Sequence, residues 1–205
     1  SYNTAVGALA GTAVTTGVQN TLIGGLAGDG TDDGDANVAV GYAALSNNSG
    51  DRNTAVGAGA LTSSTGSDNT FMGRSAGLVL SSGIKNTGVG AYALDAETSG
   101  SFSTAVGYAA LGTQNVGGGA VVHNTAVGYS AGLAVTTGIN NTLIGSLAGD
   151  ALTDADSNIA VGKSALSSDT LGSKNIAIGQ GALFTQNFTT ATDSYNVAIG
   201  HEAGV

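Results

Sequence analysis

The side chains best suited to bind an ion are the carboxylates of two aspartate-rich stretches, DGTDDGDA (29–36) and DALTDADS (150–157). The matching positions are Asp29, Asp33 and Asp35 in the first stretch and Asp150, Asp154 and Asp156 in the second. Ca²⁺ favours loops rich in such oxygen ligands. However, neither stretch has a closing glutamate in place, and Asp and Gly are the usual residues of solvated turns. Surface turns are therefore the favoured interpretation and calcium binding is the alternative; no metal site is assigned.

Aromatic side chains gather in the segment 184–195, FTQNFTTATDSY. If this segment bulges outward, Phe184, Phe188 and Tyr195 are exposed and could stack on the sugar rings of a surface glycan. If it folds down, the same rings would cap an adjacent groove. The sequence leaves both interpretations open.

Groups for catalysis are sparse. His123 and His201 are the only histidines, and neither has a Cys or a second His nearby; such a lone histidine is most often a surface residue. The only glutamates are Glu97 and Glu202, so a paired-carboxylate glycosidase site would need turn aspartates from separate parts of the chain. We therefore expect no enzyme activity, no catalytic residue and no cofactor.

The overall composition argues against two classes of partner. The 205 residues carry a formal net charge of −9 with only 5 Lys and Arg, whereas binding to a phosphate backbone needs clustered cations. No stretch approaches the ~18–20 unbroken apolar residues that span a membrane. The chain contains 35 Gly but no Pro or Cys, which rules out disulfide bonds. It begins almost directly on a repeat, so we interpret it as a fragment of a longer protein.

The chain is a succession of twelve copies of one nine-residue cassette, N-x-x-Φ-G-x-x-A-(L/G). The first residue is Asn in eleven copies, the fourth is aliphatic or Met, the fifth is Gly and the eighth is Ala. The cassettes begin at Asn3, Asn20, Asn37, Asn53, Asn69, Asn86, Ser103, Asn124, Asn141, Asn158, Asn175 and Asn196. Linkers of seven or eight residues join most of them, but 112–123 and 184–195 have twelve residues. We number the positions of a cassette one to nine.

A repeat of 16–17 residues is too short for helical solenoids, whose repeats exceed about 30 residues. It suits one coil of a parallel β-solenoid with two short strands and two tight turns, in which Gly supplies positive φ or close approach. Coils stacked at about 4.8 Å predict a rod of about 55–60 Å, with the Asn side chains hydrogen-bonded in a column along the axis. Of the 19 charged residues, 16 lie in linkers, which predicts buried cassettes and solvated linkers. Residues 1–205 are predicted to form this single all-β domain.

Both faces of the predicted strands carry apolar residues. Positions two and four point to one side and position three to the other, and cover on both sides is usual for such strands. The expected cover is another copy of the same chain, because a rod with identical apolar stripes suits a cyclic homo-oligomer.

Two columns of cassette residues are further candidates for function. Position two is Thr in eight copies, and a regular Thr column could bind ordered water as on ice-binding solenoids. Interruption by Val38, Ile159, Ile176 and Val197 favours ordinary packing of β-branched residues. Position six holds Tyr42, Tyr108 and Tyr129, which could form an aromatic strip, although we expect other coils to separate them.

Cassettes such as NVAVGYAAL (37–45), STAVGYAAL (103–111) and NIAIGQGAL (175–183) resemble the head repeats of trimeric autotransporter adhesins. They resemble still more closely the NTAVG-type repeats of bacteriophage tail fibres. This resemblance implies a left-handed parallel β-roll, a homotrimer, and a shaft or head segment of a phage tail fibre or spike in the virion that supports host attachment. A host cell-surface glycan or receptor is then a possible partner. The alternative is a bacterial surface adhesin or extracellular filament subunit, and ice or calcium binding is a distant one. The repeat period is longer than in adhesin heads.

Two blocks of the chain are near-copies of each other. Residues 3–46 and 124–167 match at 30 of 44 positions. This similarity indicates that the rod was lengthened by duplicating a block of coils rather than by acquiring a second active site.

Overall fold

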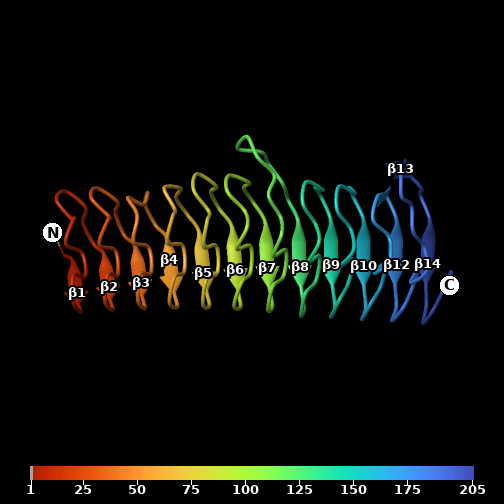
Figure 1. Cartoon of the computed structure of the whole chain (residues 1–205), viewed down its shortest axis with the longest axis horizontal. Helices are drawn as coiled ribbons and strands as arrows, with labels where there is room; N and C mark the ends of the chain where they lie inside the picture. The colour runs from red at the N-terminus through yellow and green to blue at the C-terminus, as the bar shows by residue number, and fades with distance from the viewer. Residues whose placement is uncertain (1) are drawn as a thin grey trace.

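The computed structural model describes residues 2–205 and shows a rod made of stacked coils (Figure 1). Each coil contributes one short strand to a twelve-stranded, wholly parallel sheet. Successive strands pair in register, with Thr4 beside Thr21 and Ala5 beside Leu22 in the first pair. The predicted parallel β-solenoid is therefore confirmed, and no helix occurs among the described residues.

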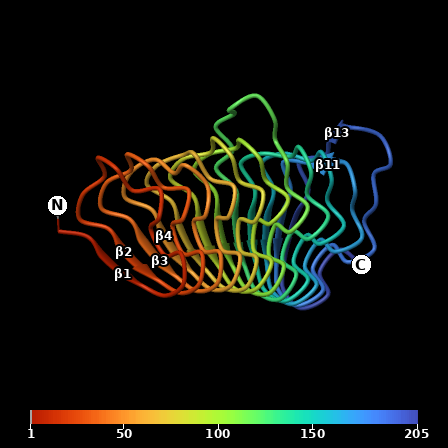
Figure 2. The ribbon, with the colours of Figure 1, turned by 60° about the vertical axis from the view of Figure 1, so that its left-hand side comes forward.

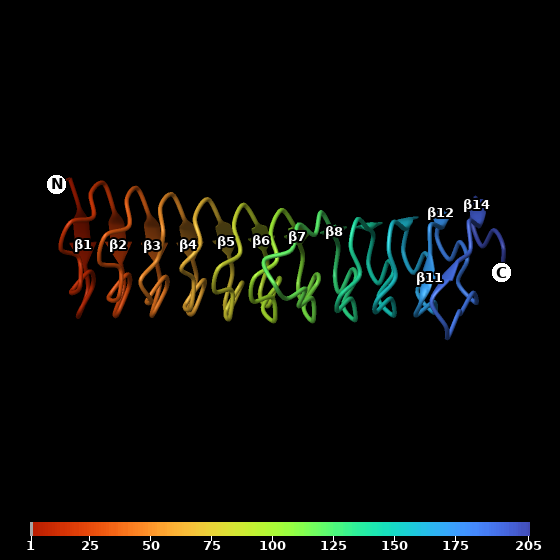
Figure 3. The ribbon, with the colours of Figure 1, turned by 90° about the horizontal axis from the view of Figure 1, so that it is seen from above.

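The main strands all have three residues and occupy positions two to four of their cassettes. They are β1 (Thr4–Val6), β2 (Thr21–Ile23), β3 (Val38–Val40), β4 (Thr54–Val56), β5 (Thr70–Met72), β6 (Thr87–Val89), β7 (Thr104–Val106), β8 (Thr125–Val127), β9 (Thr142–Ile144), β10 (Ile159–Val161), β12 (Ile176–Ile178) and β14 (Val197–Ile199). A second, two-stranded sheet pairs β11 (Gly172–Ser173) with β13 (Thr192–Asp193). Figure 3 shows the main strands following one another along one side of the rod.

The prediction of two strands in every coil is wrong. Outside β11 and β13, the linkers still donate backbone hydrogen bonds to the next coil, as from Ala13 N to Asp29 O (3.1 Å). The linkers are not strands because residues with left-handed backbone conformation (positive φ) interrupt them. The residue before each cassette after the first has a φ near +60°, although none of these residues is Gly; His123 and Lys85 are examples. Stacking on both sides holds these residues in a conformation that costs a non-Gly residue about 1–2 kcal/mol.

Position five requires Gly for two separate reasons. Its φ is near +135° in coil after coil, as in Gly24 (+134°), a region that side chains rarely enter. A Cβ on Gly24 would also lie 2.5 Å from the carbonyl oxygen of Gly41 in the next coil. The strand therefore turns at a residue that has neither a Cβ nor room for one.

The core lies between position three, which points inward from the sheet, and positions eight and nine on the following turn. The sizes of these residues are complementary. Leu22 at position three accompanies Gly28 at position nine, whose added Cβ would lie 2.5 Å from the Leu22 side chain. In the next coil Ala39 accompanies Leu45, and both are fully buried. Nine of the twelve coils therefore fill the same thin core with one large and one small residue, whereas Ala5, Ala126 and Ala198 accompany Gly in the other three.

The Asn column forms hydrogen bonds along the axis, as predicted. Except in Asn3 of the first coil and in Asn124, which follows Ser103, the backbone N–H of each Asn donates to the Oδ1 of the Asn one coil earlier, as from Asn37 to Asn20 (2.8 Å). In eight of the eleven Asn residues the side-chain Nδ2 also donates to a linker carbonyl, as from Asn20 to Gly34 O (2.8 Å). A residue such as Asn20 is thus bonded to the preceding coil through its backbone N–H and to the following coil through its side-chain amide.

Two linker carboxylates are fully buried, contrary to the expectation that linkers are solvated. Glu97 Oε1 accepts the backbone N–H groups of residues 98–100, and Asp169 Oδ1 accepts that of Gly172. Both carboxylates have 0% exposure. The presence of charged residues in the linkers is therefore not sufficient to predict that every linker residue is exposed to solvent.

Candidate binding surfaces

The outward face of the main sheet carries two columns of β-branched and apolar side chains. None of the residues at positions two and four is buried. The most exposed at position four include Val6, Ile23, Met72, Val127, Ile144, Ile178 and Ile199. Positions two and four thus define what we call the sheet face, which extends over all twelve coils. An apolar column of this length on a rod is the kind of surface that marks an interaction site.

The Thr column lies on this sheet face. Thr21, Thr54 and Thr142 are half-buried, and parallel register places Thr54 directly beside Val38 and Thr70. The interruptions noted in the sequence therefore break the column physically. Packing of β-branched neighbours accounts for these residues.

The turn that follows the strands carries an aromatic row, which we call the turn edge. Tyr108 and Tyr129 belong to adjacent coils and stack, with ring centroids 5.6 Å apart and planes inclined by 11°. Tyr92 meets Tyr108 edge to face at 5.7 Å, and the Arg74 guanidinium lies 4.5 Å from the centre of the Tyr92 ring. The expectation that other coils separate the position-six tyrosines holds for Tyr42 but is wrong for this pair.

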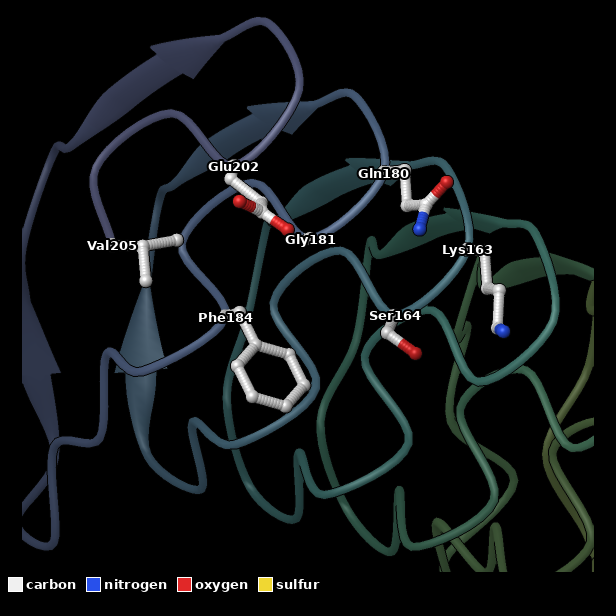
Figure 4. Close-up of a pocket in the computed structure, with 7 residues that line it drawn as sticks. All are labelled: Lys163, Ser164, Gln180, Gly181, Phe184, Glu202 and Val205. Carbon is white, nitrogen blue, oxygen red and sulfur yellow. The ribbon is translucent and has the colours of Figure 1, made fainter.

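The same edge contains a cavity of about 230 Å³ near the last coils (Figure 4). It is lined by Lys163, Ser164, Gln180, Gly181, Phe184, Glu202 and Val205. The Phe184 ring forms an apolar wall, and the amide of Gln180 and the carboxylate of Glu202 supply polar groups. A few polar groups around an apolar wall are typical of small-molecule sites.

The two twelve-residue linkers project from the side of the rod opposite the turn edge (Figures 1 and 2). In the first linker, Gln114 donates from Nε2 to Glu97 Oε2 (2.9 Å), and its Oε1 accepts from Asn124 Nδ2 (2.9 Å). It also donates to Ser103 Oγ (3.2 Å). Gln114 therefore fills the place of the amide that Ser103 lacks in the Asn column.

The second linker repeats this attachment. Gln186 donates to Asp169 Oδ2 (2.6 Å) and accepts from Asn196 Nδ2 (2.7 Å). The three aromatic rings of this linker lie in different places. Phe184 lines the cavity, Phe188 packs against the backbone of Gly172, and Tyr195 is 65% exposed. Of the two interpretations drawn from the sequence, capping describes Phe188, whereas Phe184 and Tyr195 stay accessible.

The aspartate-rich turns serve the stacking of the coils. Asp35 Oδ1 accepts the backbone N–H of Val18 (2.8 Å), and Asp156 Oδ1 accepts that of Ile139 (2.7 Å). Asp154 accepts a hydrogen bond from Thr137. Within residues 2–205 no group of three or more His, Asp or Glu side chains is placed to hold a metal ion. The structure therefore does not bring the predicted aspartates together as a calcium site.

Several other charged groups are paired or stacked at the surface. His123 packs against the Phe102 ring at 5.4 Å, and His201 lies 3.9 Å from the Glu202 carboxylate. Asp68 and Arg52 form an ion pair (2.6 Å), and the hydrogen bond from Arg52 lowers the pKa of Asp68. Desolvation raises the pKa of Asp150.

Sequence reasoning missed Arg74, Tyr92 and Lys163 as candidate site residues. Arg74 and Lys163 were visible as the rare charges inside cassettes, both at position six. Tyr92 stands at position seven, so a search of one column overlooks it. The signal that finds all three is the concentration of large side chains in the two variable positions between Gly and Ala.

Comparisons with known proteins identify no relative: no family model, no curated protein and no solved structure matches the chain. No helix in the described part of the chain has the length and hydropathy to cross a membrane.

Proposed function

We propose that this chain is a structural segment of a homotrimeric fibre of the phage tail-fibre type, which holds an attachment tip away from the particle. The observation that carries the proposal is the apolar column at position four, which remains outside the core in every coil. An apolar stripe that follows a rod from end to end matches a partner with the same repeat and length. A second copy of the chain has both.

The thinness of the rod also supports association. The core of each coil consists of one inward residue and the small or branched residues opposite it, so neighbouring coils and neighbouring chains supply much of the stabilisation, as in repeat proteins. Association would bury the sheet face and leave the turn edge and the projecting linkers accessible. The number three comes from the resemblance of the cassettes to tail-fibre and adhesin-head repeats.

The oligomeric state tests this proposal. Light scattering coupled to size exclusion should give three times the 19.6 kDa chain mass at micromolar concentration. Replacing Val89 and Val106 with Lys places two charges in the middle of the sheet face and should release monomers, whereas Lys at the turn-edge residues Ala58 and Ala91 should not. A stable wild-type monomer would contradict the proposal.

A bacterial surface adhesin or extracellular filament subunit is the second candidate, favoured by the exposed aromatic row on the turn edge. The two candidates differ in the rest of the gene. A virion-joining segment or chaperone domain beside these coils would support the fibre, and a membrane anchor would support the adhesin.

A further inference from the structure

The aromatic row ends at a break on the turn edge. Tyr129 stacks on Tyr108 through one ring face, so its other face is directed toward the next coil. The residue at position six of that coil is Ser146, which is small, and the position-six residue one coil further is Lys163. With coils about 4.8 Å apart, about 10 Å separates the backbone under Tyr129 from that under Lys163.

This break has the dimensions of one flat ring. A ring in van der Waals contact with Tyr129 lies about 3.5–4 Å from it, which leaves about 6 Å to Lys163, within reach of its flexible side chain. Within the row, the ring centroids of Tyr108 and Tyr129 in adjacent coils are 5.6 Å apart, so the break between Tyr129 and Lys163 has the place of one missing ring. A ligand ring over Ser146 would therefore continue the stack.

The charge beside the break is available to a ligand. Among residues 2–205 the four ion pairs involve Arg52, Lys174 and His201 but not Lys163, and the Lys163 side chain is exposed. Tyr129 is also 57% exposed. An exposed ring face opposite an ammonium group fits a ligand with an apolar ring face and a negative charge.

The cavity beyond Lys163 extends the same surface. Lys163 stands at its rim, and Phe184, Gln180 and Glu202 line it (Figure 4). Its volume of about 230 Å³ is below the range of drug-sized pockets, so it would take a single small ring. The Glu202 carboxylate disfavours an acid there but accepts hydrogen bonds from hydroxyl groups.

We propose that the turn edge from Tyr129 to Phe184 binds an acidic oligosaccharide. One uronic-acid-like ring stacks on Tyr129 over Ser146 with its carboxylate on the Lys163 ammonium, and a neutral sugar occupies the cavity beside Phe184. The site goes beyond the proposed fibre role, because it is formed within one chain and needs no association of chains.

Calorimetric titration of the 205-residue chain tests this site, using hexasaccharides of hyaluronan and of galacturonate as acidic probes and chitohexaose as the neutral probe. We expect at least one acidic probe to bind at least tenfold more tightly than chitohexaose. Tyr129→Ala and Lys163→Gln should each weaken acidic binding at least tenfold, and Lys163→Gln should abolish the preference for the acidic probe.

Tyr42→Ala is the matched control, because Tyr42 occupies position six of the duplicated block and has no aromatic neighbour in the row. It should change affinity less than twofold. Absence of binding to both acidic probes at 5 mM would overturn the proposal, as would an equal loss in Tyr42→Ala. A Tyr129→Ala variant that dissociates the oligomer but binds saccharide normally would also overturn it, since the row would then be a contact between chains.

Discussion

The two near-identical blocks, residues 3–46 and 124–167, have the same framework but different turn edges. Leu22 and Gly28 in the first block pack as Leu143 and Gly149 do in the second. Eight of the 14 differences lie in linkers, but within the cassettes position six differs in all three coils: the first block has Ala8, Gly25 and Tyr42 and the second has Tyr129, Ser146 and Lys163. The comparison teaches that fixed cassette positions build the rod, while the two positions between Gly and Ala are free to acquire a binding surface.

The largest expected effect tests whether the core obeys the same size rule in both blocks. Leu22→Ala should cost about 2–5 kcal/mol through the cavity that it leaves, and Gly28→Leu should cost at least about 1–3 kcal/mol through overpacking. The double variant reproduces the Ala39–Leu45 pairing of the next coil and should recover most of the loss. Chemical denaturation measures all three.

The same exchange at Leu143 and Gly149 should give matching values. If the double variant of either block is no more stable than its single variants, size complementarity does not govern the core. If only one block recovers, the two frameworks are not equivalent.

Removing one Asn from the column should have the next largest effect. Asn141→Ala deletes the acceptor of the Asn158 N–H (2.9 Å) and the donor to Ala155 O (2.7 Å), which leaves buried polar groups unsatisfied at about 1–3 kcal/mol each. Asn20→Ala in the first block should lose a similar amount in thermal or denaturant unfolding. Thr142→Ala, on the outward face, is the control and should lose less than 1 kcal/mol; a loss equal to that of Asn141→Ala would contradict the role of the column.

A smaller effect concerns the pH dependence of stability. Burial raises the pKa of Asp150 above its ordinary value of 3.8, so the folded state favours the protonated acid and loses stability as the pH rises through that raised pKa. Asp150→Ser, which copies Ser167 at the same position of the next coil, removes this penalty. The variant should be more stable than wild type at pH 7, by less than about 1 kcal/mol because the group is partly solvated and screened.

That advantage should disappear in unfolding experiments below pH 3.8, where the wild-type carboxyl is protonated in both states. An advantage that is the same at pH 3 and pH 7 would show that packing, and not charge, causes it.

The smallest expected effect tests backbone strain at the residue before a cassette. Ala36 and Ser157 occupy equivalent places in the two blocks, with φ of +55° and +58°. Gly adopts this conformation without the strain of about 1–2 kcal/mol but loses more entropy on folding. Ala36→Gly and Ser157→Gly should each gain roughly 0.5–1 kcal/mol in denaturant unfolding, and destabilisation in both would contradict the strain argument.

The sequence predicts the features of the rod that repeat. The spacing of Asn, Gly and Ala is sufficient for the parallel stack, its register and the Asn column, because each coil must present the same groups to its neighbours. Leu45 at a φ of +52° could not be predicted in this way, since only stacking on both sides holds a Leu there. Glu97 was also beyond sequence reasoning, because its partner Gln114 comes from the next coil.

The candidate surfaces were less predictable than the fold. Position-six tyrosines are visible in the sequence, but the contact of Tyr92 with Tyr108 depends on ring orientations that a repeat pattern does not contain. The cavity beside Lys163 is likewise formed by residues of three stacked coils, so it cannot be read from any one cassette.

The direction of the hydrogen bonds between coils has a mechanical consequence. The covalent chain winds around the rod, so tension applied along the axis is borne at every coil boundary by the hydrogen bonds and packing between neighbouring coils. The coil boundaries carry this tension in series. The rod therefore fails at the boundary with the weakest hydrogen bonds and packing. The Gln114 amide reinforces the boundary where Ser103 interrupts the column. A polar side chain in a projecting linker thereby contributes to the tensile strength of the whole rod.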